Sequence, residues 1–197
     1  MARVRTFGPV KLFTGVLASD PALFSSVKTV LQERYGPVDL ESDVIPFTFT
    51  NYYENEMGPA ICRKFYSFAQ LIDAESLAKI KIETNALEQL FAATSAPIAR
   101  PVNLDPGYVE NAKVLLASTK NFYHRIYLGS GIFAEVTLHF RGKGFLFFPW
   151  TYQDYRTEPY LAFFAQARGR YLEQTKAIGP IGRIRPISPI SPEGATP

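Results

Sequence analysis

Cysteine is almost absent from this chain of 197 residues, in which Cys62 is the only one. A single thiol excludes an internal disulfide framework and a zinc site built on several cysteines. The chain also lacks a run of about 18 apolar residues, which a membrane-spanning helix requires. Its first residues contain no apolar stretch of the kind found in a signal peptide. We therefore expect a cytoplasmic protein with no membrane partner.

Neither sign of charge dominates the sequence, because 21 Lys and Arg face 18 Asp and Glu, for a net charge of +3. A dedicated nucleic-acid-binding protein carries a larger basic excess. Hydrophobic residues make up 47% of the chain, which excludes disorder for most of it. We predict one globular domain over residues 1–177 and an extended Pro-rich tail over residues 178–197, where prolines exclude helix and central strand.

Apolar patterning predicts an α+β fold with about three helices on an antiparallel or mixed sheet. Residues 10–18 read as a strand, and a helix begins at Pro21, capped by Asp20. A hairpin with an irregular loop is expected over residues 47–68, and a second hairpin joins residues 124–128 to residues 132–140. Residues 145–150 form a further strand, and the last helix covers residues 159–176.

Two segments are less clear-cut. Residues 79–83 alternate apolar and polar side chains, which favours a strand, although the apolar spacing around them also fits a helix. We predict a strand there, followed by a helix that Asn85 caps together with Glu88. Residues 103–107 contain Asp-Pro-Gly, which is typical of a turn, so a loop is expected at that point.

The second hairpin concentrates polar chemistry. Pairing Leu128 with Ile132 across a three-residue turn places Arg125 opposite Glu135, and alternation sets Glu135 and His139 on one polar face. The other face is predicted to be the core side, with Ile126, Leu128, Ile132, Ala134, Val136, Leu138 and Phe140. One interpretation of the polar face is a solvated surface with an ion pair. The other is a cleft.

If the polar face lines a cleft, cationic side chains beside an imidazole can bind a phosphate or a carboxylate and move a proton. The candidate catalytic residues are then His124 and Glu135. The candidate ligand-binding residues are Arg100, Asn103, Asp105, Lys120 and Arg125. The carboxylates of Glu54 and Glu56 are assigned to an acidic turn; a divalent cation held together with Asp105 or Glu88 is the alternative.

Several stretches, taken together and in order, resemble an uncharacterised bacterial family, domain of unknown function 4416. They are residues 52–58 (YYENEMG), 102–108 (VNLDPGY), Lys120 with 124–128 (HRIYL), 134–138 (AEVTL) and 150–155 (WTYQDY). The resemblance covers nearly the whole chain except its tail. It implies a cytoplasmic bacterial protein and confers no catalytic residue.

Some members of that family carry the label GTP-binding protein, and residues 103–106 (NLDP) are similar to a short motif of GPN-loop GTPases. Those enzymes also need Gly-x4-Gly-Lys-Ser/Thr, whose amides and Lys hold the phosphates. The sequence contains no such motif. A P-loop GTPase is therefore disfavoured.

Three functions stay open. We favour a protein that binds or acts on a small anionic ligand in a polar pocket. A module for RNA or single-stranded nucleic acid is the first alternative, since 14% of the residues are aromatic and exposed rings can stack on bases. A structural protein that binds a partner is the second. The sequence assigns no cofactor, no metal and no oligomeric state, and it does not decide between binding and catalysis.

Overall fold

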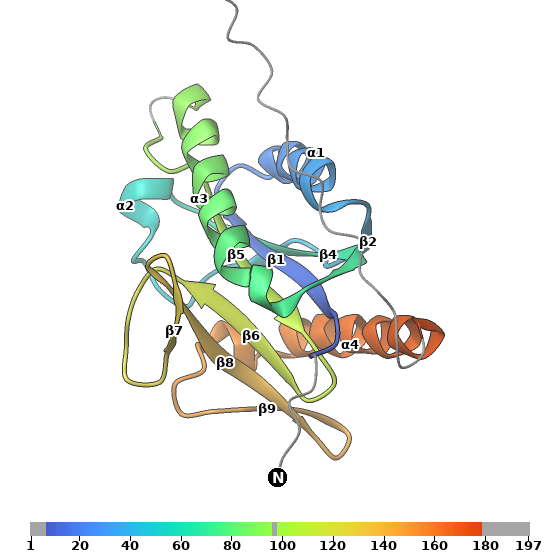
Figure 1. The fold of residues 1–197 in the computed structure, drawn as a ribbon. Coiled ribbons are helices and arrows are strands. Elements are labelled where there is room, and N and C mark those ends of the chain that lie inside the picture. The colour runs from blue at the N-terminus through green and yellow to red at the C-terminus, as the bar shows by residue number, and fades with distance from the viewer. Residues whose placement is uncertain (1–6, 96–97, 179–197) are drawn as a thin grey trace, which may run out of the picture.

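The computed structural model describes residues 7–95 and 98–178, and within them one antiparallel sheet is flanked by helices (Figure 1). The predicted α+β class is confirmed. The tail predicted at residues 178–197 lies outside the described residues, apart from Ile178, which ends α4. In chain order the elements are β1 (Val10–Ala18), α1 (Leu23–Tyr35), β2 (Val38–Glu41), β3 (Ile45–Pro46), α2 (Glu54–Met57), β4 (Cys62–Ile72), η1 (Ala74–Ser76), α3 (Leu77–Thr94), β5 (Val102–Val109), β6 (Lys113–Ser118), β7 (Ile126–Gly129), β8 (Ile132–Arg141), β9 (Gly144–Phe147), η2 (Asp154–Arg156) and α4 (Glu158–Ile178).

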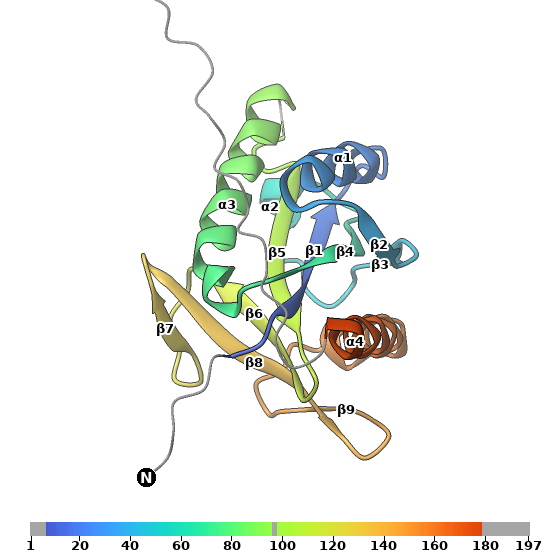
Figure 2. The ribbon, with the colours of Figure 1, turned by 45° about the vertical axis from the view of Figure 1, so that its right-hand side comes forward.

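The strands follow the order β2-β4-β1-β5-β6-β8-β7, with β3 also paired to β4 and β9 to β8. Helices α1 and α3 cover one face of this sheet and α4 covers the other, as Figures 1 and 2 show. Each face therefore has its own apolar core. None of the helices described here is long and apolar enough to cross a membrane.

The first predicted strand is confirmed with its bounds, and all nine residues of β1 are buried because both faces are covered. The predicted helix after it begins two residues later than expected, at Leu23. The Asp20 carboxylate accepts a hydrogen bond from the Ala22 amide at 2.9 Å, so it caps the turn that leads into α1.

The strand predicted at residues 79–83 is wrong, because these residues belong to α3. Leu77, Ile80, Thr84 and Leu87 are buried at helical spacing, whereas Ile82 is 44% exposed. The apolar residues at helical spacing therefore decide the structure of this segment, and the apolar-polar alternation of residues 79–83 does not. Helix α3 begins at Leu77 rather than at Asn85, which lies inside it.

The loop predicted at residues 103–107 is also wrong, because this segment is part of β5. Strand β5 pairs with β1 along its whole length but with β6 only from Gly107 to Val109. On its β6 side the first half of β5 therefore has no neighbouring strand. Pro106 is tolerated there because it lies where the β6 ladder ends.

The second hairpin is confirmed, with two changes. Gly129 rather than Leu128 pairs with Ile132, because a bulge shifts the register next to the turn. The predicted core side is wrong for β7, whose Ile126 and Leu128 are 70% and 43% exposed. Conversely, Glu135 is buried, because residues 150–151 cover the polar face and donate hydrogen bonds to the carbonyls of β8.

Candidate functional site

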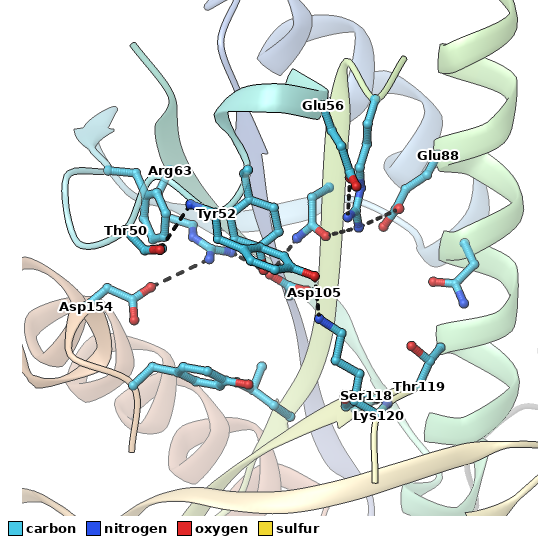
Figure 3. Close-up of a pocket in the computed structure, with 18 of the residues that line it drawn as sticks. Thr50, Tyr52, Glu56, Arg63, Glu88, Asp105, Ser118, Thr119, Lys120 and Asp154 are labelled. Carbon is cyan, nitrogen blue, oxygen red and sulfur yellow. Dashed lines mark hydrogen bonds and ion pairs between the residues drawn. The ribbon is translucent and has the colours of Figure 1, made fainter. Parts of the chain in front are cut away.

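A cavity of about 1000 Å³ opens where β5 and β6 diverge (Figure 3). Its walls come from α3, from the segment around α2, from the ends of β5 and β6, and from the segment that leads into η2. Its polar lining residues include Glu56, Arg63, Lys81, Glu88, Arg100, Asn103, Asp105, Ser118, Lys120, Arg125, Glu135, Tyr152 and Asp154. The rings of Phe47, Phe49, Tyr52, Tyr53 and Tyr155 complete the wall.

Helix α3 supplies the hydrogen bonds that a neighbouring strand would otherwise give to β5. Lys81 Nζ donates to the Leu104 carbonyl at 2.7 Å, and the Leu104 amide donates to Glu88 Oε1, also at 2.7 Å. Lys81 and Glu88 lie seven positions apart, on one face of the helix. The amide and the carbonyl of Leu104 are satisfied in this way although no strand pairs with β5 at this point.

Arg63 reaches the cavity from β4 by crossing the central strand. Its NH1 atom lies 2.8 Å from Asp105 Oδ2 and its NH2 atom 3.6 Å from Asp154 Oδ2. Burial alone would raise the pKa of both carboxyl groups. For Asp105 the charges of Arg63 and Lys81 prevail and hold the pKa below its usual range, whereas for Asp154 burial prevails and the pKa is raised.

Arg100 joins the two acidic residues on the α2 and α3 sides of the cavity. NH2 donates to Glu88 Oε2 at 3.1 Å and to Asn103 Oδ1, and NH1 lies 3.5 Å from Glu56. Asn103 in turn donates to Asp105 Oδ2 at 2.7 Å. Burial raises the pKa of Glu88 in spite of the nearby cations. A hydrogen-bonded chain thus runs from Glu88 to Asp105.

Most donors of the Arg125 guanidinium are engaged by the protein. Nε donates to Glu135 Oε2 at 2.9 Å, and NH2 donates to the Tyr152 hydroxyl at 2.6 Å. NH1 donates to Ser118 Oγ and to the Lys120 carbonyl, at 3.1 and 2.8 Å. The guanidinium therefore ties β6, β8 and the segment before η2 together, and few of its donors are left for a ligand.

Lys120 differs from the other cations of the wall. Its Nζ lies 3.3 Å from the Tyr52 hydroxyl and 4.8 Å from the centre of the Tyr52 ring. Arg63, Lys81, Arg100 and Arg125 each pair with a carboxylate. Among the described residues, Lys120 is the only lysine or arginine of the lining without such a pair.

Six of the seven residues predicted from the sequence line this one cavity: Arg100, Asn103, Asp105, Lys120, Arg125 and Glu135. The seventh, His124, lies behind Glu135. Its Nε2 is 3.1 Å from Glu135 Oε2, and its ring stacks on Trp150 with centroids 5.3 Å apart. A direct role for His124 in proton transfer is not supported by this position, whereas a role in holding Glu135 is.

Sequence reasoning missed Arg63, Lys81, Asp154, Tyr52 and Tyr152 as parts of the site. Lys81 stood inside the apolar stripe of a helix, and this was the one available signal, because a lysine is rarely buried without a polar partner. Arg63 carries no such signal, since its partners lie on other elements, Asp105 on β5 and Asp154 in η2.

The alternative of a divalent cation at the acidic turn finds no support. Glu54 and Glu56 both lie on α2, and Arg100 pairs with Glu56 as well as with Glu88. Across residues 7–95 and 98–178, no group of three or more His, Cys, Asp and Glu residues could hold a metal ion.

The comparison with protein families accounts for this combination of motifs. A family model described as "Domain of unknown function (DUF4416)" matches residues 8–171. The chain belongs to this family. The match runs from just before β1 into α4, so every wall of the cavity lies within the DUF4416 domain. No curated protein and no solved structure matches the chain.

Proposed function

We propose that this DUF4416 protein binds, or acts on, a small ligand that carries a phosphate or a carboxylate, and that the cavity between β5 and β6 is its site. One observation carries the proposal: the exposed ammonium of Lys120 stands on the wall of a large concave cavity without a carboxylate partner among the described residues. Pockets of roughly 300–1000 Å³ with a few convergent polar groups are typical of small-molecule sites.

The site also offers groups for proton transfer. Burial raises the pKa of Glu88 and of Asp154, which brings both carboxyl groups closer to the range in which a general acid works. Glu135 faces the cavity with its orientation fixed by Arg125 and Thr137. If the ligand reacts, these three carboxyl groups are the candidates for acid and base. The cytoplasmic location expected from the sequence is part of this proposal.

A protein-binding role is the second candidate, and the exposed side chains at the β7 edge of the sheet favour it. Tyr123, Ile126 and Tyr127 are 75%, 70% and 60% exposed, and they lie outside the cavity. Exposed apolar side chains at an edge strand are typical of contact surfaces. Nucleic-acid binding is less well supported, because the cations of the cavity are mostly paired with carboxylates.

A thermal-shift screen tests the ligand proposal with inorganic phosphate, sugar phosphates, nucleotides and organic acids. A ligand at 100 times its Kd stabilises the fold by about 2.7 kcal/mol, which raises the melting temperature of a domain of this size by roughly 5–10 °C. Lys120→Ala should abolish the shift. Lys143→Ala, which removes an exposed lysine in the turn before β9, should leave it unchanged. A shift that survives Lys120→Ala, or no shift with any anion, would show that the assignment is wrong.

A further inference from the structure

The cavity holds as many carboxylates as cations. Its cationic lining residues are Arg63, Lys81, Arg100, Lys120 and Arg125, and its acidic lining residues are Glu56, Glu88, Asp105, Glu135 and Asp154. A site for a polyanion would have an excess of positive charge. The balance here suits a ligand whose own charges add up to about zero.

The opposite charges are not evenly mixed. Glu135 pairs with Arg125, and the pair of Glu56 and Glu88 shares Arg100 and Lys81, so these groups cancel locally. What is left is separated in space. Lys120 has no carboxylate partner among the described residues, whereas two carboxylates, those of Asp105 and Asp154, share the single charge of Arg63.

Figure 3 shows Asp154 and Arg63 on one side of Tyr52 and Lys120 on the other, with Asp105 beside Tyr52 between them. The Tyr52 ring is 60% exposed and forms the wall between them. A ligand that spans the cavity would therefore meet a positive group at one end, an aromatic surface along its middle, and a negative region at the other end.

The negative region also contains buried polar atoms that no described residue satisfies. Tyr155 lines the cavity and is 2% exposed, yet its hydroxyl has no hydrogen-bond partner among the described residues. Nε of Arg63, whose side chain is 4% exposed, also has no partner there, but this group is a donor and needs an acceptor rather than an ammonium group. An orphaned buried polar atom is costly unless something completes its hydrogen bonds. A tyrosine hydroxyl beside two carboxylates forms a set of acceptors for an ammonium group.

Asp105 presents a suitable acceptor in this set. Both hydrogen bonds that it accepts, from Arg63 and Asn103, go to Oδ2. Its side chain is 26% exposed, and Oδ1 accepts no hydrogen bond from the described residues, so Oδ1 is left for a ligand. The cations nearby also hold the pKa of Asp105 below its usual range, so its carboxylate is charged at neutral pH.

We infer that the ligand of this cavity is a zwitterion, whose anionic group binds Lys120 and whose ammonium group binds Asp105, Asp154 and the Tyr155 hydroxyl. This inference rests on the proposed function and names the class of its ligand. The carbon chain between the two charged groups lies along the Tyr52 ring. A neutral hydroxyl in place of the ammonium would leave the second carboxylate of the negative region without a counter-charge.

The inference is tested with probes that differ only in the ammonium group. γ-Aminobutyrate and ε-aminocaproate are compared with butyrate and caproate by calorimetry and by thermal shift on the full chain. We expect at least one of the two amino acids to bind tenfold or more tightly than its deaminated analogue. Lys120→Ala should weaken binding of both members of the pair.

Variants at the other end separate the ammonium contact from the anion contact. Asp154→Asn should remove the advantage of the amino acid and leave binding of the plain acid unchanged, and Asp43→Asn, at an exposed position outside the cavity, is its matched control. Tyr155→Phe removes a hydroxyl that has no partner among the described residues, so the fold should tolerate it. We expect it to weaken the amino acid severalfold and to spare the plain acid.

The outcomes distinguish the inference from the proposed function. If the plain acids bind as tightly as the amino acids, and neither Asp154→Asn nor Tyr155→Phe discriminates between them, the zwitterion is wrong and the anion site stands. If neither the amino acids nor the plain acids bind, but a phosphate compound binds and loses its binding in Lys120→Ala, the zwitterion is again wrong and the anion site again stands. If no anion depends on Lys120, both the inference and the proposed function are overturned.

Discussion

Arg63 and Asp105 form an ion pair of 2.8 Å although a whole strand lies between them. Arg63 lies on β4 and Asp105 on β5, and β1 separates these two strands. Gly15 of β1 pairs with Asp105 and makes the approach possible, since a Cβ atom there would lie 2.9 Å from Arg63 NH1. The Arg63 side chain passes over the backbone of Gly15, where no Cβ atom blocks it, and so its guanidinium reaches the cavity.

Gly15→Ala should therefore destabilise the protein by about 1–3 kcal/mol, as overpacking of a filled interior does. The added methyl group would also lie 2.9 Å from the ring of Phe65, which is fully buried and cannot move aside. Urea unfolding measures the loss. Gly169→Ala is the control: this glycine is exposed in α4 with open space around it, so the change should stabilise by about 0.5–1 kcal/mol. Equal effects at the two positions would contradict the crossing described for Arg63.

Asp105→Asn should lower stability in a pH-dependent way. The folded-state pKa of Asp105 lies below its ordinary value of 3.8, because the charges of Arg63 and Lys81 outweigh the effect of burial. A depressed pKa means that the carboxylate stabilises the fold above about pH 3.8 and loses this effect as the pH falls through the folded-state value. We expect a loss of about 1.5–3 kcal/mol near neutral pH. The difference between variant and wild type should shrink on acidification; a constant difference would refute the assignment.

Glu88→Leu should destabilise by about 1–3 kcal/mol, because it leaves the Leu104 amide without an acceptor. Glu88→Gln keeps an oxygen at the same place and should cost clearly less. Chemical unfolding of the two variants, with amide hydrogen exchange at Leu104, measures the contrast. Equal losses would mean that the charge of Glu88, and not its hydrogen bond to β5, matters for the fold.

Arg125→Ala should cost about 3–5 kcal/mol, because it leaves the buried carboxylate of Glu135 without its cation. Adding Glu135→Gln to Arg125→Ala should recover part of this loss, and a double-mutant cycle measures how much. Lys120→Ala should change stability by less than about 0.5 kcal/mol, as expected for an exposed side chain. For this reason Lys120 is the cleaner position for testing ligand binding. A double variant no more stable than Arg125→Ala would speak against the pair.

Elements with one consistent signal could be predicted from the sequence. Residues 10–18 are mostly apolar, are flanked by turn residues and form β1 with the predicted bounds. The hairpin around residues 129–131 placed Arg125 beside Glu135, and the contact exists although the register next to the turn differs by one residue. Local pattern sufficed in both cases because neighbouring residues decide the structure.

The strand predicted at residues 79–83 and the loop predicted at residues 103–107 are wrong for the same physical reason. In both segments, contacts with residues far away in the sequence decide the structure. Lys81 lies between Ile80 and Ile82, and this alternation made the start of α3 look like a strand. Lys81 is nevertheless buried in the helix, because it donates to the carbonyl of Leu104 on another element. Residues 105–107 looked like a turn, but Pro106 lies on a strand at the point where one neighbour is missing. No pattern within the segment could show either partner.

The candidate site could be predicted in part for the same reason. Motifs after β4 supplied Arg100, Asn103, Asp105 and Arg125, and all of them line the cavity. The sequence could not show which of these cations pairs with a carboxylate, because the order of the strands decides which side chains meet. Arg125 was expected to bind the ligand but its donors are used within the protein, whereas Lys120 is free of carboxylates among the described residues.

In an ordinary sheet, two neighbouring strands are held about 4.8 Å apart by their backbones, and side chains cannot change that spacing. Between β5 and β6 only three residue pairs impose it. Before Gly107, β5 has no strand on this side, and two side chains of α3, Lys81 and Glu88, hold Leu104 instead. The lengths of these two side chains therefore set the spacing between α3 and β5, which are two walls of the cavity, and substitution there changes that spacing while β5 keeps its register with β1.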